Sequence, residues 1–327
     1  MLINSTQDIY DHIGRAINLS MEMTAIKPYI VIAEHKFIKL ALGSAFYIEL
    51  DTQLRLNTLS VDNAFLLPYV QRASAFYAYG KYLPFSIGSD GDNGLQEVET
   101  DKTKPARLQV LNRREDEAFE NASISMELLF QQLFENQNKY STFWNSSRGL
   151  ALKNSWFVTG EQLTKALPFV EESYRLLVSL NPYFEHAENK ISSAISEGVV
   201  AQLRAYNPTT NYNEVLEKGL KLLKAYLAYE AYSQATVHLN VRHTRTGLKV
   251  LSSFDGVTTS KVPDPRQVAE YARSISIATQ GAYSDLVSYL NTNADFFTTF
   301  KTMPAYSAIA KSSMPDNKKY KRVFRMS

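Results

Sequence analysis

Apolar side chains recur with helical spacing along most of this 327-residue chain. The clearest examples are residues 63–82 and 214–232, where apolar positions lie three or four residues apart. This spacing places them on one face of an α-helix. Capping patterns predict two more helices: Ser5 or Thr6 precedes a segment with isoleucines four residues apart, and Thr159 precedes Gln162 by three residues. The pattern predicts a mainly α protein.

The period changes after each of the two strongest helices. Residues 85–99 carry a cluster of Gly, Ser, Asp and Asn between extended flanks, and residues 236–251 alternate apolar and polar positions around Thr246-Gly247. Such patterns predict one small β-hairpin in each half. A proline-marked segment follows each hairpin. A long helix is then expected up to about Asn136 or Asn293, with a short aromatic helix closing each half.

The two halves also share residues in the same order. Four groups match at offsets of 150 to 157 residues, among them Pro28-Tyr29 with Pro182-Tyr183 and Ala75–Tyr82 with Ala225–Tyr232. A repeat of this length predicts a tandem duplication of one helical domain. We expect Pro28 and Pro182 to lie in the first turn of equivalent helices. Gly43 should end its helix, opposite Glu197 in the second half.

The expected domains are a first repeat over residues 1–148, a second over 155–305 and a C-terminal arm over 306–327. The segment Asn145–Gly149 (NSSRG) is interpreted as the linker between the repeats.

Composition narrows the range of functions. With 35 basic and 33 acidic residues the formal charge is +2, which does not favour a binder of nucleic acid or membranes over its whole surface. There is no cysteine, which excludes disulfides, Cys-ligated metals and a Cys nucleophile. No signal peptide or membrane-spanning segment is visible in the sequence. We expect a chain made in a cytoplasm.

Candidate chemical sites are few. The five histidines lie in no metal-binding spacing, and His35 and His186 do not match between the repeats. The acidic loop Asp90–Gly94 fails the calcium-loop pattern, because glycine stands at its fifth position instead of its sixth. Glycine-rich phosphate loops and nucleophile-elbow motifs are absent from the sequence. We therefore expect no enzyme activity, no cofactor and no metal.

Tyrosine is abundant, with 20 residues. Tyr79, Tyr82, Tyr229 and Tyr232 stand at matching places in the two repeats. At helical spacing, aromatic residues are usually core, but tyrosine is also enriched at protein interfaces. Both interpretations stay open from the sequence.

The C-terminal arm has the strongest local charge. From Lys311 onward it holds six basic residues against Asp316, a net charge of +5 in a chain whose total is +2. Such an arm can dock on an acidic partner or remain a solvated tail. The residues expected to bind a partner are Lys318, Lys319, Lys321, Arg322, Phe324 and Arg325.

The first half resembles a protein family of phages and prophages of Bacteroidetes hosts. The resemblance rests on IKPYIVIAEHKFIKLALGSAFYIEL (26–50), LLPYVQRASAFYAY (66–79), NGL (93–95) and KPA (104–106). The second half keeps the layout but loses much of this pattern.

That resemblance implies a function. In such phages, including the crAss-like group, proteins of this layout look like head-to-tail connector (adaptor) proteins. It implies a virion protein that forms a homo-oligomeric ring of about 12 copies, by analogy with adaptors. The ring would lie between the portal protein and the tail, and DNA would pass through its channel without sequence-specific binding. A cytoplasmic two-repeat module that binds a protein or ligand between its halves is the alternative. A third hypothesis is an enzyme that uses scattered carboxylates or His243.

Overall fold

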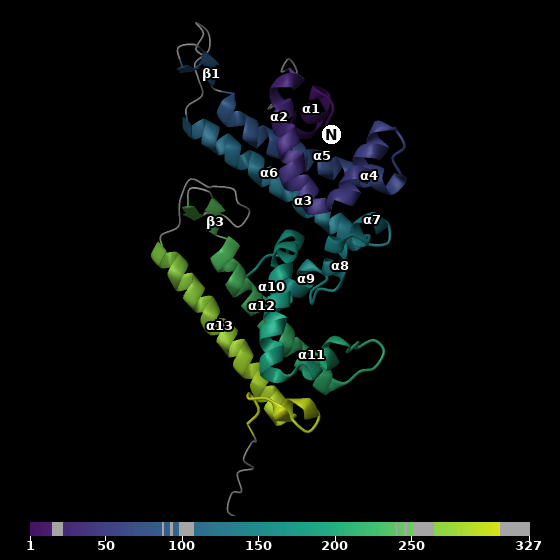
Figure 1. The fold of residues 1–327 in the computed structure, drawn as a ribbon, viewed down its shortest axis with the longest axis vertical. Helices are drawn as coiled ribbons and strands as arrows, with labels where there is room; N and C mark the ends of the chain where they lie inside the picture. Colours follow the sequence, from purple (N-terminus) through teal and green to yellow (C-terminus); the bar gives the residue numbers. More distant parts are fainter. Residues whose placement is uncertain are drawn as a thin grey trace, which may run out of the picture.

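In the computed structural model, the chain folds into two helical repeats that lie end to end (Figure 1). The structure describes residues 1–14, 22–86, 88–91, 94–97, 108–239, 241–244, 247–250 and 265–307. The mainly α fold with a tandem duplication is confirmed.

The first repeat is built around two long antiparallel helices joined through a pair of strands. Its elements are α1 (Thr6–Ile13), α2 (Met23–Ala33), the π-helical turn η2 (Glu34–Ile38), α3 (Lys39–Leu42), α4 (Ser44–Arg55), α5 (Val61–Tyr82), the 3-10 turn η3 (Leu83–Phe85), β1 (Gly88–Gly91), β2 (Gly94–Glu97), α6 (Leu108–Glu135), α7 (Ser141–Trp144) and α8 (Ser147–Lys153).

The second repeat follows the same order. Its elements are α9 (Gly160–Ala166), α10 (Tyr174–Ile195), α11 (Glu197–Arg204), α12 (Glu214–Leu239), β3 (Val241–Thr244), β4 (Gly247–Val250), α13 (Pro265–Thr292) and the 3-10 turn η4 (Thr298–Thr302). Thus α10 corresponds to α2–η2–α3, and α12 and α13 correspond to α5 and α6. In both repeats these last two helices pack along each other.

The two matching prolines lie inside their helices, so their predicted place in the first turn is wrong. Pro28 is the sixth residue of α2 and Pro182 the ninth residue of α10. A helix can begin upstream of a proline where its first turn is well capped, as at Ser173, whose hydroxyl accepts from the Leu176 N–H at 3.1 Å. The predicted caps Ser5 and Thr159 are confirmed, since their hydroxyls accept from the N–H groups of Asp8 and Gln162.

Two further expectations about matching positions need correction. Gly43 ends α3 as predicted, but its counterpart between α10 and α11 is Ser196 and not Glu197, which begins α11. The predicted linker Asn145–Gly149 overlaps α8. Gly149 packs so tightly there that an added Cβ would lie 2.2 Å from the carbonyl oxygen of Phe143. This close approach to a backbone explains the glycine.

Each repeat has one antiparallel strand pair between its long helices. Gly88 pairs with Glu97 in the first, and Val241 pairs with Val250 in the second. The second pair begins later than the alternating pattern suggested, because Thr236–Leu239 continues α12. Thr236 is buried, and its hydroxyl donates to the Tyr232 carbonyl one turn earlier, as in an uninterrupted helix.

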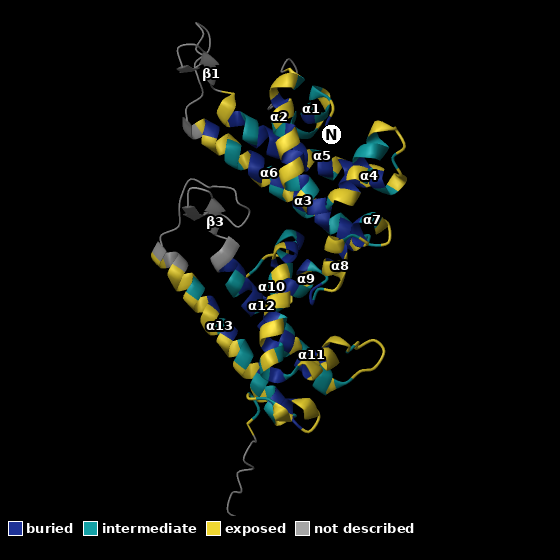
Figure 2. Ribbon diagram, viewed as in Figure 1, coloured by how far each residue is buried: buried dark blue, intermediate teal, exposed yellow. Residues whose placement is uncertain are grey.

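The core runs continuously through both repeats (Figure 2). Its largest fully buried side chains include Trp144, Phe46, Phe157 and Phe184. In the described part of the chain, none of the helices joins the length and the apolar character that crossing a membrane requires.

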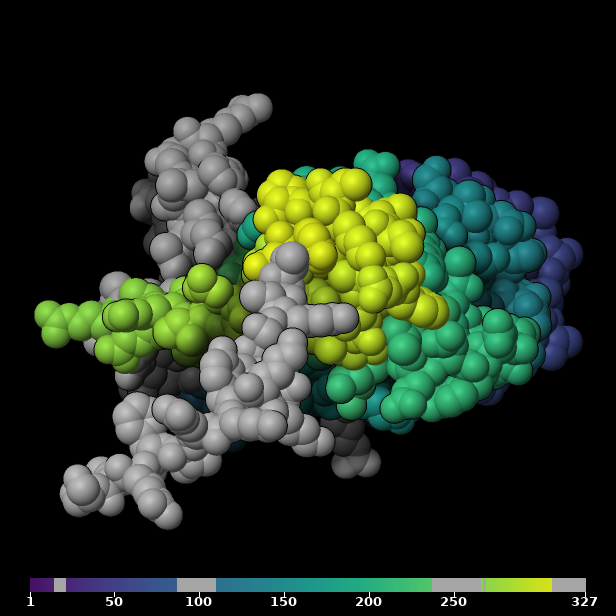
Figure 3. Space-filling model, turned by 90° about the horizontal axis from the view of Figure 1, so that it is seen from below, coloured from purple at the N-terminus to yellow at the C-terminus, as the bar shows by residue number. Residues whose placement is uncertain are grey.

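The far end of the second repeat is closed by the segment after α13 (Figure 3). Thr299 of η4 lies against Gly198 of α11, where an added Cβ would be 3.1 Å from its hydroxyl. Ser307, the last described residue, donates its N–H to the Asn291 side chain at 2.7 Å. The described chain therefore ends beside the C-terminal end of α13.

Candidate functional site: the junction between the repeats

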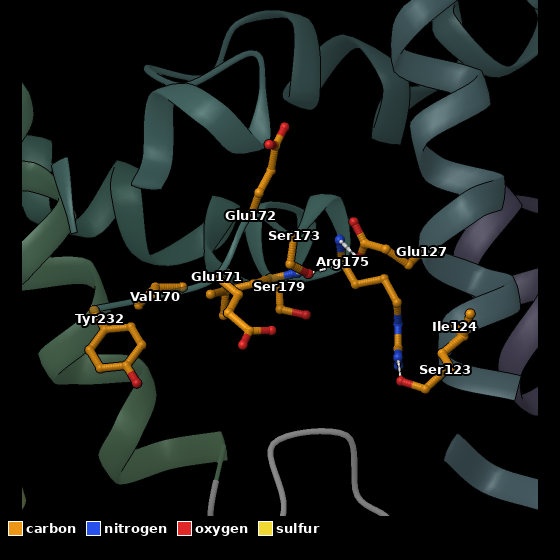
Figure 4. A pocket seen from close by; sticks show the side chains of 11 residues that line it. Ser123, Ile124, Glu127, Val170, Glu171, Glu172, Ser173, Arg175, Ser179 and Tyr232 are labelled. Atoms are coloured by element: carbon orange, nitrogen blue, oxygen red, sulfur yellow. Dashed lines mark hydrogen bonds between the residues drawn. The ribbon is translucent and has the colours of Figure 1, made fainter. Parts of the chain in front are cut away.

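The repeats meet where the middle of α6 lies against the first turn of α10. The Glu127 carboxylate lies at the centre of this contact. The Ser173 hydroxyl donates to Glu127 at 2.7 Å, the Arg175 N–H donates to the same oxygen at 3.1 Å, and the Tyr174 N–H donates to the other oxygen (Figure 4). The first N–H groups of a helix have no partner within the helix, and its N-terminus attracts negative charge. Glu127 of the first repeat therefore caps a helix of the second.

Neighbouring contacts tighten the same junction. The Arg175 guanidinium donates to the Ser123 hydroxyl one turn before Glu127. The rings of Phe134 and Tyr174 pack with their centroids 5.2 Å apart. Both repeats also line a small cavity of about 200 Å³, to which Arg148 and Arg175 contribute. The junction thus combines polar capping with aromatic packing.

A cleft of about 370 Å³ opens beside this contact. Ser123, Ile124 and Glu127 of α6 form one wall, residues 170–173 and α10 form another, and Tyr232 of α12 closes the far side. In Figure 4 the Glu171 and Glu172 side chains point in opposite directions from the segment before α10.

The tyrosines around the cleft stay protonated at neutral pH. Burial raises the pKa of Tyr174, and the nearby carboxylates, Glu135 first, raise it further. Burial also raises the pKa of Tyr232, as does its hydroxyl contact with Tyr271 at 3.0 Å. These phenols therefore act as neutral hydrogen-bonding groups. Glu127, which also lines the cleft, is already engaged by the α10 backbone.

The partner-binding residues expected from the sequence, Lys318, Lys319, Lys321, Arg322, Phe324 and Arg325, lie outside the described residues. The four matching tyrosines belong mostly to the core: Tyr79 and Tyr232 are buried, and Tyr82 and Tyr229 are half-buried. Tyr82 packs on Tyr29 with the ring centroids 5.6 Å apart.

The described histidines take part in no metal-binding cluster. His12 contacts Gln71 at 3.4 Å, and the His35 ring lies 6.4 Å from that of Tyr47. The side chains of His238 and His243, and of the acidic loop Asp90–Gly94, are outside the described part of the structure. Within that part, no group of three or more His, Cys, Asp or Glu side chains could hold a metal ion.

The sequence did not point to Glu127, Ser173 or Arg175. Ser173 followed by an apolar segment is a capping signal. However, Pro182 was expected in the first turn of this helix, which placed the predicted helix start too far downstream. The role of Glu127 depends on a contact between residues 46 positions apart, and no local pattern marks it.

The family profile described as "Family of unknown function (DUF6712)" matches the chain twice, over residues 38–150 and 189–308. The chain belongs to the DUF6712 family. The two DUF6712 matches fall one in each structural repeat, so the duplicated unit of the structure is also the unit of the family. No curated protein and no solved structure matches the chain.

Proposed function

We propose that this DUF6712 protein is a structural virion protein of a tailed phage, a head-to-tail connector that forms a homo-oligomeric ring between portal and tail. The ring surrounds the channel through which DNA passes, and the protein carries out no catalysis. The resemblance of residues 26–106 to a phage family motivates the proposal. The observation that carries it is an exposed apolar surface on the first repeat.

This surface, here named the corner stripe, consists of three exposed residues, Leu56, Val61 and Phe65, and the half-buried Tyr69. Val61 is 87% exposed, Leu56 66% and Phe65 57%. Val61, Phe65 and Tyr69 lie four residues apart on α5, so they share one face of the helix. The rings of Phe65 and Tyr69 contact each other with their centroids 6.2 Å apart. Contiguous exposed apolar side chains of this kind mark protein interfaces.

The second repeat lacks the corner stripe. Counted from the matching Tyr79 and Tyr229, its positions are Asn211, Val215 and Gly219. Gly219 is covered, since an added Cβ would lie 3.0 Å from Leu203. The corresponding corners of the two repeats therefore present different surfaces. A ring closes through heterologous contacts, in which one surface meets a different surface on the next copy.

Light scattering after size exclusion, together with particle imaging, tests the ring. Wild-type protein should form closed rings as its concentration rises. The double variant Val61→Asp/Phe65→Asp should remain monomeric with an unchanged circular dichroism spectrum, because both side chains are exposed. Tyr212→Asp is the matched control at the corresponding corner of the second repeat, where Tyr212 is 69% exposed, and it should still assemble. A monomer at every concentration, alone and with the portal protein, would contradict the proposal.

The basic arm supplies a second contact in this proposal. A chain ending at Met314 removes five of the six basic residues of the arm and should fold normally, because the described core ends before it. Incorporation of this variant into particles should fall sharply and depend on salt, since several exposed charges act together.

The junction cleft favours a second candidate function, a two-repeat module that holds a partner between its halves. Neighbouring genes separate the two: portal and capsid genes beside this one favour the connector. A cytoplasmic complex recovered with the protein, and lost in a Glu171→Lys variant, favours the module.

A further inference from the structure

The two repeats differ at one position between their long helices, which is buried in the first repeat and exposed in the second. In the first repeat, Phe119 of α6 packs directly on Gly80 of α5, where an added Cβ would lie 3.2 Å from the Phe119 ring. The Tyr77 ring lies 6.2 Å from that of Phe119, and Tyr77 stacks on Phe37 at 4.0 Å. Aromatic side chains thus fill the space between the long helices.

In the second repeat the corresponding residues are polar. Counted from Tyr79 and Tyr229, Glu230 replaces Gly80, and counted from Leu129 and Leu286, Ser276 replaces Phe119. An open cavity of about 430 Å³ lies at this position between α10, α12 and α13. Its buried lining includes Tyr226, Glu230 and Thr279, and its exposed lining includes Lys190 and Ser276.

A charged pair stands at this cavity. The Glu230 residue is 6% exposed, and its carboxylate accepts from the Lys190 ammonium at 2.7 Å and from the Gln234 amide at 2.7 Å. The Lys190 side chain is 58% exposed, so it can shift toward solvent. A buried carboxylate beside an ammonium gives one acceptor and one donor a few ångströms apart, which suits neighbouring hydroxyl groups of a ligand.

Two tyrosines line another part of the cavity. The rings of Tyr226 and Tyr283 lie 5.9 Å apart. Burial and the Glu230 carboxylate raise the pKa of Tyr226, which keeps its hydroxyl protonated. Aromatic faces pack against the C–H face of a ring whose edge bears hydroxyls, and pockets of this size with a few polar groups are typical of small-ligand sites.

We propose that this cavity, at the position that the Phe119 ring occupies in the first repeat, binds a small neutral polyhydroxylated ligand of monosaccharide size. A neutral ligand fits best, because the charges of Glu230 and Lys190 offset each other. A cationic ligand would have to displace Lys190, and an anionic one would face Glu230. The proposal does not depend on the connector function.

Titration calorimetry and saturation-transfer NMR on the full chain, with a panel of neutral hexoses and pentoses up to about 10 mM, test it. At least one sugar should bind saturably to the wild type. Ser276→Phe, which restores the residue of the first repeat and fills the cavity, should weaken that binding by at least about tenfold. Glu230→Gln, which keeps the volume but removes the charge, should weaken it by a similar factor. Ser284→Ala, on an exposed part of the same helix, should bind as the wild type does.

Absence of binding by every sugar in the panel overturns the proposal, and so does binding that Ser276→Phe leaves unchanged. The double variant Glu230→Gly/Ser276→Phe reproduces both residues of the first repeat. It serves as the filled-cavity variant if the single change does not fold, and it must also lose the binding.

Discussion

Gly43 and Ser196 hold the same unusual backbone conformation at the same place in the two repeats. Gly43 has φ 79° and ψ 154°, and Ser196 has φ 90° and ψ 135°. Each residue ends one helix and begins the next. This region of backbone space is nearly reserved for glycine, because a Cβ is strained there. The second repeat therefore keeps the bend but places a strained residue at it.

Ser196→Gly should stabilise the protein. Relief of the strain contributes about 1 to 3 kcal/mol, and loss of the Ser196 hydroxyl contact with the Gly198 N–H costs a few tenths. The melting temperature should rise by about 2 to 4 °C, measured by calorimetry. Gly43→Ser is the matched control. The space beside Gly43 is open, with the Ser146 hydroxyl 3.9 Å from an added Cβ, so a fall in stability there would report backbone strain alone.

Removing the carboxylate at the junction should loosen the two repeats from each other. Glu127→Ala leaves the Tyr174 and Arg175 N–H groups without their acceptor, which costs about 1 to 3 kcal/mol. Hydrogen exchange should accelerate in the first turn of α10 before it does in the cores of the repeats. Ser284→Ala, the equivalent position on α13, should leave exchange unchanged. Equal protection in Glu127→Ala and wild type would show that the other contacts, the Arg175–Ser123 hydrogen bond and the packing of Phe134 on Tyr174, are enough to hold the junction.

The matching carboxylates of the two repeats should differ in importance. Glu34 is fully buried and accepts from the Leu2 N–H at 2.7 Å and the Tyr47 hydroxyl at 2.6 Å. Glu188 is only partly buried and accepts from the Trp156 ring N–H at 2.9 Å and from Arg204. Glu34→Gln should lower the free energy of unfolding by about 2 to 3 kcal/mol, because the buried amide NH₂ would face the Leu2 N–H or the Tyr47 hydroxyl, which are themselves donors. Glu188→Gln should cost less, since water can replace the lost contacts. Urea unfolding of both variants gives the comparison.

His12 should make stability depend on pH. Burial lowers its pKa below the ordinary value of 6.5, against smaller opposing effects of Gln71, Asp11 and Asp8. Below about pH 6.5 the unfolded chain then binds more protons than the folded one, so this group lowers stability as the pH falls. His12→Gln should flatten the stability profile between pH 7 and pH 5, measured by urea unfolding. If stability changes with pH as steeply in His12→Gln as in the wild type, other titrating groups cause the pH dependence.

The helical class, the duplication and several helix ends could be predicted from the sequence alone. These depend on local physics: the apolar stripes of residues 63–82 and 214–232 follow the helical period, and Ser5 and Thr159 cap through their own side chains. The repeat was visible because matched residues such as Tyr79 and Tyr229 keep their order. The start of α10 was misjudged, because its first turn is capped partly by Glu127 of the other repeat.

What the positions between the long helices do depends on packing that the sequence does not show. In the sequence, Gly80 and Glu230 look like an ordinary difference between the repeats. In the structure, Gly80 packs on Phe119, whereas Glu230 lines a cavity together with Ser276. The corner stripe could not be told from core by spacing, since exposure depends on what packs across it, as Leu203 does over Gly219. Such outcomes arise from contacts between segments far apart in the chain, and no periodicity records them.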